Sequence, residues 1–215
     1  MGSGLMPRLK LGFHISIFII GFISVILHIL FSPDPLVSTT KFTIHSNLIV
    51  SFTFLFSGIV LMQGKNEGTM LEFFKNCSLI YMAVNLLTYH FLLTSGGEYA
   101  GVHVITNFTV HYLIPCMVFI NWLLFEVKKK YHYRYIFYWV FYPLLYTIVS
   151  SIRGLIDGFY PYFFLNPNGQ IPVGVGSYTN VFLFMVAFLF VFVILGFLLI
   201  MGNRLVLLIN NKREA

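Results

Sequence analysis

Long apolar stretches separated by short polar connections run along most of the chain. A helix needs about 20 apolar residues to cross the ~30 Å hydrocarbon core of a bilayer, and six stretches reach that length. None of the six contains aspartate, glutamate or lysine, and Arg153 is their only arginine. The pattern predicts an all-α integral membrane protein with a single six-helix transmembrane domain over residues 1–215. The expected helices cover residues 11–31, 43–63, 76–95, 102–125, 135–154 and 178–202.

The composition indicates that lipid is part of the solvent of this chain. Hydrophobic residues make up 58% of the 215 residues and charged residues only 9%, whereas soluble domains carry about 25% charged residues. The formal net charge is +6, but the basic residues lie in short connections between apolar stretches. We therefore expect membrane lipids as partners and no nucleic acid.

The distribution of lysine and arginine predicts how the chain crosses the membrane, because cytoplasmic connections are enriched in both residues. With the N-terminus in the cytoplasm, eleven basic residues fall on the cytoplasmic side, and only Lys41 and Arg153 fall on or near the other side. Both termini are thus expected in the cytoplasm, and the plasma (inner) membrane is the expected location. Whether the chain forms a homo-oligomer stays open.

Several segments have a separate interpretation. Residues 1–5 have the character of a cloning remnant, with Met6 as an alternative native start. The connection at 155–177 is rich in proline, glycine and aromatic residues and lacks lysine and arginine. It is either an outer cap that dips toward the bundle or an ordinary exposed loop held at the interface by its aromatic rings. Cys77 and Cys116 lie in apolar stretches, so we expect them to pack as small hydrophobic residues rather than to form a disulfide or metal site.

Polar residues gather at the predicted outer ends of the helices, where ionisable groups are expensive and often functional. His103, Asn107 and His111 are spaced i, i+4, i+8 and therefore share one helix face. Pro115 has no N–H, so the carbonyl of His111 is expected to lose its partner and the helix to kink there. Further members of this polar group are Thr43, Ser46 and Asn47 on one face of the second expected helix, with His28, His90 and Arg153 at similar depth.

A hydroxyl and an imidazole in a dry cavity are the minimum for nucleophilic acyl transfer. Here Thr43 is the candidate nucleophile and His111 the candidate base. Asn47 or Asn107 could donate to the oxyanion, and Arg153 at the rim could hold a substrate carboxylate. Ser46, His90 and His103 are further candidates for substrate or oxyanion contacts. The competing interpretation is that these groups only form hydrogen bonds that tie helices together.

Two other function classes stay open at this point. Small-molecule or lipid binding, or transport, would suit a polar outer vestibule, although no internal repeat marks a midplane site. Haem binding would use His14 and His28, which are 14 residues apart on one helix. Bis-histidine ligation needs a matching pair on a second helix, and the sequence offers only His103 and His111, eight residues apart.

Three short motifs resemble those of a known family. They are Lys41-Phe42-Thr43, then Asn107-x-x-x-His111 followed by Pro115, and the aromatic stretch from Trp139 to Leu165 that contains Tyr160-Pro161-Tyr162. The first two resemble the androgen-induced protein and the androgen-dependent regulator of tissue factor pathway inhibitor, and the third is similar to the bacterial six-pass branch of that superfamily.

The resemblance implies a membrane-embedded threonine hydrolase that cleaves fatty acid esters of hydroxy fatty acids or similar amphipathic lipid esters. It implies Thr43 as the nucleophile and His111 as its partner, with no metal or organic cofactor. No carboxylate that would orient His111 is evident in the sequence, so a full catalytic triad is not expected.

Overall fold

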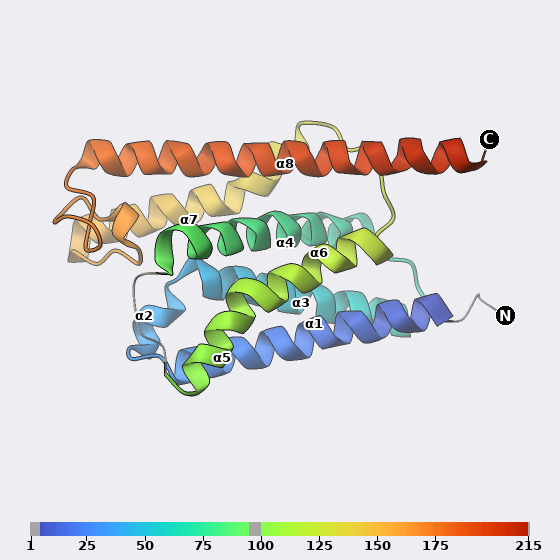
Figure 1. Cartoon of the computed structure of the whole chain (residues 1–215), viewed down its shortest axis with the longest axis horizontal. Helices are drawn as coiled ribbons and strands as arrows, with labels where there is room; N and C mark the ends of the chain where they lie inside the picture. Colours follow the sequence, from blue (N-terminus) through green and yellow to red (C-terminus); the bar gives the residue numbers. More distant parts are fainter. Residues whose placement is uncertain (1–4, 95–99, 215) are drawn as a thin grey trace. The chain divides into compact units, whose positions relative to one another are not determined.

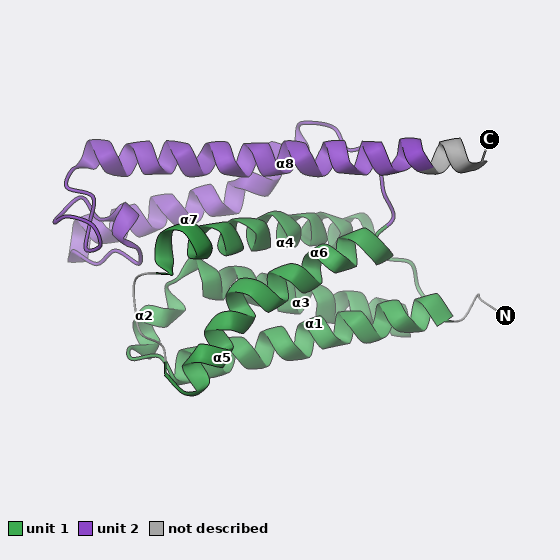
Figure 2. Cartoon of the chain, in the orientation of Figure 1, with its two compact units in different colours: residues 1–126 green, residues 127–215 purple. Residues whose placement is uncertain are grey.

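The computed structural model describes residues 5–94 and 100–214, with side chains through residue 209, so most of the predicted 1–5 remnant lies outside the described residues. These residues are predominantly helical and contain no strand. Six of the helices are long and apolar enough to cross a membrane, as the apolar stretches predict (Figure 1). The chain is an all-α, multi-pass membrane protein. It divides into two compact units, residues 1–126 and 127–215 (Figure 2).

Unit 1 contains four of the six long segments. Two of these segments include a π-helical turn, η1 after α4 and η2 between α5 and α6, which the sequence did not predict. The short helix α2 was not predicted either; Asp34 caps it by accepting a hydrogen bond from the N–H of Val37 at 3.0 Å. The elements are α1 Leu5–Leu30, α2 Pro35–Thr39, α3 Phe42–Met62, α4 Thr69–Thr88, η1 Tyr89–Leu93, α5 Val102–Phe108, η2 Thr109–Leu113 and α6 Ile114–Phe125.

Small residues allow α1 and α3 to pack closely. A Cβ at Gly21 would lie 2.7 Å from Oγ of Ser51, and a Cβ at Gly58 would lie 2.9 Å from the side chain of Ile15. Helices in lipid gain little from the hydrophobic effect, so such close backbone approach is a main source of their association. The α1–α3 pair is therefore the framework on which the polar side chains of unit 1 are positioned.

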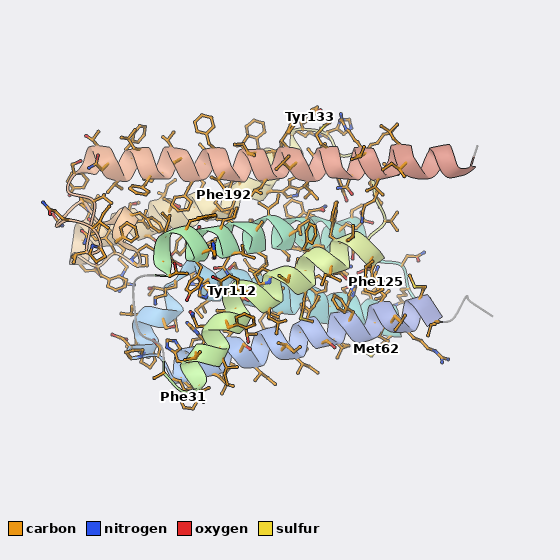
Figure 3. The ribbon with its side chains drawn as sticks, in the orientation of Figure 1. Phe31, Met62, Tyr112, Phe125, Tyr133 and Phe192 are labelled. Atoms are coloured by element: carbon orange, nitrogen blue, oxygen red, sulfur yellow. The ribbon has the colours of Figure 1, made fainter. Side chains whose placement is uncertain are left out.

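An apolar layer crosses the middle of unit 1. It consists of Ile17, Val50, Phe54, Met82, Ile114 and Val118 from α1, α3, α4 and α6, all of them buried. Polar side chains gather on either side of it, around Thr43 and around Ser57. These two residues are 14 positions apart on α3, which is about 21 Å at 1.5 Å per residue. Phe31 and Met62, labelled in Figure 3, mark the two ends of unit 1.

A network of charged residues closes the end of unit 1 near Met62, and we call it the Lys75 network. Lys75 is only 5% exposed and binds the carboxylates of Glu67 and of Glu126, the latter at 2.8 Å. Lys10 lies 2.5 Å from Glu67, and buried His14 bonds Ser57 and Asn121, each at 2.8 Å. The prediction placed Lys75 in a connection, but α4 begins at Thr69, and paired acids allow the lysine to be buried in its second turn.

The Lys75 network predicts a specific acid sensitivity. Burial alone would raise the pKa of Glu67, but attraction by Lys75 and hydrogen bonds from Lys10, Lys75 and Ser57 outweigh it and lower that pKa to about 2. A carboxyl with a lowered pKa contributes stability above its unfolded value that is lost as the pH falls toward its folded value. The thermal midpoint of the wild type, measured in detergent, should thus fall more steeply between pH 4.5 and pH 2 than that of Glu67→Gln. Parallel curves would contradict this role of Glu67.

Unit 2 contains α7 Tyr135–Asp157, the 3-10 turn η3 Phe163–Leu165 and α8 Tyr178–Glu214. The connection at 155–177 folds back onto its own unit, because the ring of Phe164 packs on Phe184 and Phe188 of α8, with centroids 6.1 and 4.8 Å apart. The ring of Tyr160 covers Gly154, and a Cβ there would overlap with it, so any side chain at this position would have to displace that ring. The segment is a packed aromatic turn, and its predicted dip toward the whole bundle stays a prediction.

Candidate functional site

Thr43 and His111 lie next to each other in unit 1, as the sequence analysis expected for a nucleophile and its base. Oγ1 of Thr43 in the first turn of α3 is 3.3 Å from Nε2 of His111 in η2. Both residues are buried, with 4% and 5% of their surfaces exposed. The pair therefore sits in a dry environment, where polar interactions are strong and water is excluded.

The backbone fixes the orientation and the tautomer of His111. Nδ1 lies 2.9 Å from the carbonyl oxygen of Asn107, one turn earlier. A carbonyl can only accept, so Nδ1 carries the hydrogen, and Nε2 of the neutral ring presents its lone pair to Thr43. The ring of Tyr89 stacks on the imidazole with centroids 3.9 Å apart and holds its plane. A backbone carbonyl thus takes the place of the orienting carboxylate that the sequence lacks.

The hydroxyl of Thr43 has two acceptors for its single hydrogen. Oδ1 of Asn85, on α4, lies 2.9 Å away, closer than Nε2 of His111 at 3.3 Å. Only one acceptor can take the hydrogen at a time. In the resting arrangement the shorter bond to Asn85 is favoured, and a rotation about one side-chain bond of Thr43 aims the hydrogen at His111.

The π-helical turn explains which carbonyl Pro115 leaves without a partner. In η2 the N–H of Ile114 bonds the carbonyl of Thr109, five residues earlier, so the partner of the Val110 carbonyl would be residue 115, which has no N–H. The expectation named the carbonyl of His111 because it assumed α-helical spacing. The side-chain amides of Asn85 and Asn47 donate to Val110 instead, at 2.7 and 3.2 Å. Pro115 thereby recruits two asparagines to the site.

Two buried acceptors of the site have no donor among the described residues. They are the Oδ1 atoms of Asn47 and Asn107. The amide nitrogens of the same side chains are in use: Asn47 donates to the carbonyls of Thr43 and Val110, and Asn107 donates to the hydroxyl of Tyr89. A buried polar atom without a partner costs about 1–3 kcal/mol. A cluster that served only to tie helices together would be expected to satisfy its members.

The other predicted site residues divide into those near the pair and those apart from it. The ring of His103 lies 4.4 Å from that of His28, which in turn lies 6.4 Å from His111. Ser46 donates to the carbonyl of Thr43 at 3.1 Å and so serves the backbone of α3. His90 is exposed and bonds Tyr112, labelled in Figure 3, at 3.2 Å, so it does not reach the pair.

Arg153 belongs to unit 2 and has its own partners there. Its Nε bonds the carboxylate of Asp157 at 3.0 Å, and its guanidinium stacks on the ring of Phe159 at 4.3 Å. Both members of the ion pair are nearly half exposed. The interfacial pair is thus the arrangement found within unit 2, and a role in holding a substrate stays a prediction.

Asn85 and Tyr89 are site residues that the sequence analysis did not find. Both lie in the third apolar segment, where an asparagine is unusual enough to serve as a signal. Tyr89 carried no such signal, because tyrosine is common near membrane interfaces. Its position depends on the π-helical turn η1, which begins at this residue.

The side-chain contacts bear on the expectations for haem binding and for the two cysteines. Both ring nitrogens of His14 are engaged, by Ser57 and Asn121, so His14 offers no free nitrogen to a haem iron in this arrangement. Cys77 is buried as expected, whereas Cys116 is exposed. Cys116 lines, with Pro115 and apolar residues of α4 and α6, a groove of about 410 Å³.

Comparison of the chain with protein-family models, with curated proteins and with solved structures gave no match.

Proposed function

We propose that the chain is an intramembrane hydrolase of lipid esters in which Thr43 is the nucleophile and His111 the general base. The observation that carries the proposal is the 3.3 Å contact between Oγ1 and the lone pair of Nε2, in a buried site where the other ring nitrogen is fixed by a carbonyl. A hydroxyl is activated when it contacts a base and a third group holds that base in place. Thr43, His111 and the carbonyl of Asn107 have this arrangement.

The reaction follows from this geometry in two stages. Nε2 removes the proton of Thr43 as its oxygen bonds to the ester carbonyl carbon, and the resulting imidazolium then protonates the departing alcohol. Water repeats the steps on the acyl-threonine and releases the acid. The unpaired Oδ1 atoms of Asn47 and Asn107 are acceptors suited to orient that water or the departing hydroxyl.

Tyr89 is the donor we propose for the oxyanion. Its hydroxyl oxygen already accepts from Asn107, so its own hydrogen remains to be donated. Asn47 and Asn107 were expected in this role, but the amide nitrogen of Asn47 donates to two backbone carbonyls and that of Asn107 donates to Tyr89.

Tyr89→Phe should therefore reduce kcat for ester hydrolysis by about 10²–10³-fold, the usual effect of losing one oxyanion donor. The phenyl ring keeps the stacking on His111, but the buried amide of Asn107 loses its acceptor. The variant should therefore be destabilised by about 1–3 kcal/mol, and its kcat is compared well below its thermal midpoint. Steady-state kinetics and thermal unfolding in the same detergent check both parts. A variant with unchanged kcat would remove Tyr89 from the mechanism.

The test of the proposal itself is covalent labelling with a fluorophosphonate probe, followed by mass spectrometry of the labelled peptide. Wild-type protein should carry the adduct on Thr43, and His111→Ala should lose it. Thr53→Ala is the matched control, because Thr53 is a buried threonine of α3 whose hydroxyl bonds a backbone carbonyl of its own helix, that of Ile49 at 2.6 Å. An adduct on another residue, or no adduct on folded protein, would contradict the assignment.

The resemblance to the androgen-induced protein superfamily supports an amphipathic ester, such as a fatty acid ester of a hydroxy fatty acid, as the substrate. The same proposal places the Thr43 end of unit 1 at the outer side of the plasma (inner) membrane, with both termini in the cytoplasm.

Binding or transport of a lipid without chemistry is the second candidate. It is favoured by the shorter bond from Thr43 to Asn85 rather than to His111, and it predicts ligand binding without an adduct.

A further inference from the structure

Lys41 is a half-buried cation without an acidic partner. It precedes α3 directly and lies two residues before Thr43. No carboxylate of the described residues lies within 4.0 Å of its ammonium group, and Asp34, the acid on the preceding connection, caps α2 instead. Burial lowers the pKa of Lys41, as expected when an ammonium group loses water and gains no counter-charge.

Lys75, at the opposite end of unit 1, is a buried lysine that has acidic partners. Lys75 binds two carboxylates, those of Glu67 and Glu126. The charges of the Lys75 network thus balance, with Lys10 and Lys75 against Glu67 and Glu126. Lys41 stands alone by comparison, although a buried charge is costly unless it is paired.

The surroundings of Lys41 contain further groups that can donate to an anion. Lys41 interacts electrostatically with His28, His103 and His111, and the rings of His28 and His103 lie only 4.4 Å apart. Lys41 also stands at the N-terminal end of a 21-residue helix, where the helix dipole disfavours a cation and favours an anion. Lys41, the imidazoles of His28 and His103 and a helix N-terminus thus lie at one end of unit 1, whereas both ring nitrogens of His111 are engaged by Asn107 and Thr43.

We propose that Lys41, together with His28 and His103, binds the anionic headgroup of an amphipathic ligand beside Thr43. The proposal deepens the proposed function, on which it rests for the identity of that ligand as a substrate. An anion at this place would neutralise Lys41 and compensate the helix dipole, and it would accept a hydrogen from an imidazole that takes up a proton as the anion binds. The ligand is expected to carry an apolar chain, because the proposed substrate is an amphipathic ester.

The test is direct binding of radiolabelled palmitate to detergent-purified protein, with methyl palmitate and acetate as competitors. Thr43→Ala is used alongside the wild type so that turnover does not enter the measurement. Palmitate should compete at least 10-fold better than its uncharged methyl ester, and acetate should compete weakly because it lacks the chain. Lys41→Met should weaken palmitate binding by about 10- to 100-fold, the usual range for a hydrogen bond to a charged group.

Lys65→Met is the matched control, since it removes the same charge from an exposed lysine in the connection between α3 and α4. It should bind palmitate as the wild type does. Equal competition by palmitate and methyl palmitate, or unchanged binding by folded Lys41→Met, would overturn the proposal. Competition by acetate as strong as by palmitate would also overturn it, because the site would then take a free anion.

The experiment separates this proposal from the hydrolase proposal. Charge-dependent binding that requires Lys41, in a protein whose Thr43 takes no fluorophosphonate, supports an anion site in a binding protein. An adduct on Thr43 together with binding that ignores Lys41 supports the hydrolase and removes the headgroup site.

Discussion

Thr43→Ala is expected to abolish ester hydrolysis, with a loss in kcat of about 10⁴-fold or more, as found when a catalytic nucleophile is removed. The reason is the position of Oγ1, which lies 3.3 Å from Nε2 of His111. Among the described residues, no second hydroxyl bonds that nitrogen. His111→Ala removes the general base, and it should lower kcat by about 10²–10⁴-fold. The measurement is release of fatty acid from an amphipathic ester by purified protein.

Control variants make this expectation specific. Thr53→Ala loses a buried hydroxyl from the same helix, and His45→Ala loses an imidazole whose Nε2 bonds the carbonyl of Thr39. Both should retain turnover within a few-fold of the wild type. Thr43→Ser keeps the hydroxyl and should retain measurable activity. Full activity in folded Thr43→Ala would refute the mechanism, whereas equal losses in all these variants would point to damage of the fold.

The double mutant adds a further criterion. Residues that act as one catalytic unit show strongly non-additive effects, because the second substitution removes a function that is already lost. Thr43→Ala combined with His111→Ala should therefore be little slower than the Thr43→Ala variant alone. Multiplied losses would indicate two independent roles, for example a binding threonine and a remote histidine.

The six long helices were predictable because a helix inside the lipid core must be apolar along its whole length, and hydropathy along the chain shows this. A stretch of about 20 apolar residues has few alternatives to a membrane helix. The bounds were less accurate where charges lie inside a helix. The first two turns of α1 and α4 contain Arg8, Lys10, Glu72 and Lys75, and a search for uncharged stretches excludes them.

The proximity of Thr43 and His111 was expected from depth and helical phase, but the shape of the site was not. The turns η1 and η2 change the helical register at Tyr89 and before Ile114, and no local pattern announces a π-helical turn. The register decides that Val110, rather than His111, presents the carbonyl that binds Asn85 and Asn47. Pairing across helices depends on such shifts of about one residue, and a single sequence does not contain them.

Lys75→Met is expected to cause the largest loss of stability among single substitutions in unit 1. The side chain of Lys75 is 4% exposed, and its partners Glu67 and Glu126 are 10% and 15% exposed. Removing one partner of a buried ion pair destabilises a protein by about 3–5 kcal/mol, because the remaining charges stay buried without compensation. The variant should unfold at a clearly lower temperature in detergent, as followed by intrinsic fluorescence.

Matched variants distinguish this electrostatic loss from lost packing. Lys65→Met removes an exposed lysine and should shift the thermal midpoint little, as most surface substitutions do. Lys75→Met combined with Glu67→Gln should recover part of the loss, since one uncompensated carboxylate is then neutral. If Lys75→Met is as stable as the wild type, the network does not hold this end of the unit together.

Substitutions in the Lys75 network and substitutions in the Thr43 site are expected to have independent effects. The buried apolar layer that includes Val50, Phe54 and Ile114 separates them, and about 21 Å lies between Ser57 and Thr43 along α3. Distant substitutions without shared partners usually act additively. Lys75→Met should therefore lower the thermal midpoint while kcat, measured well below that midpoint, stays near the wild-type value. A parallel loss of kcat in the folded variant would instead show that the charged end of unit 1 positions the helices that hold Thr43 and His111.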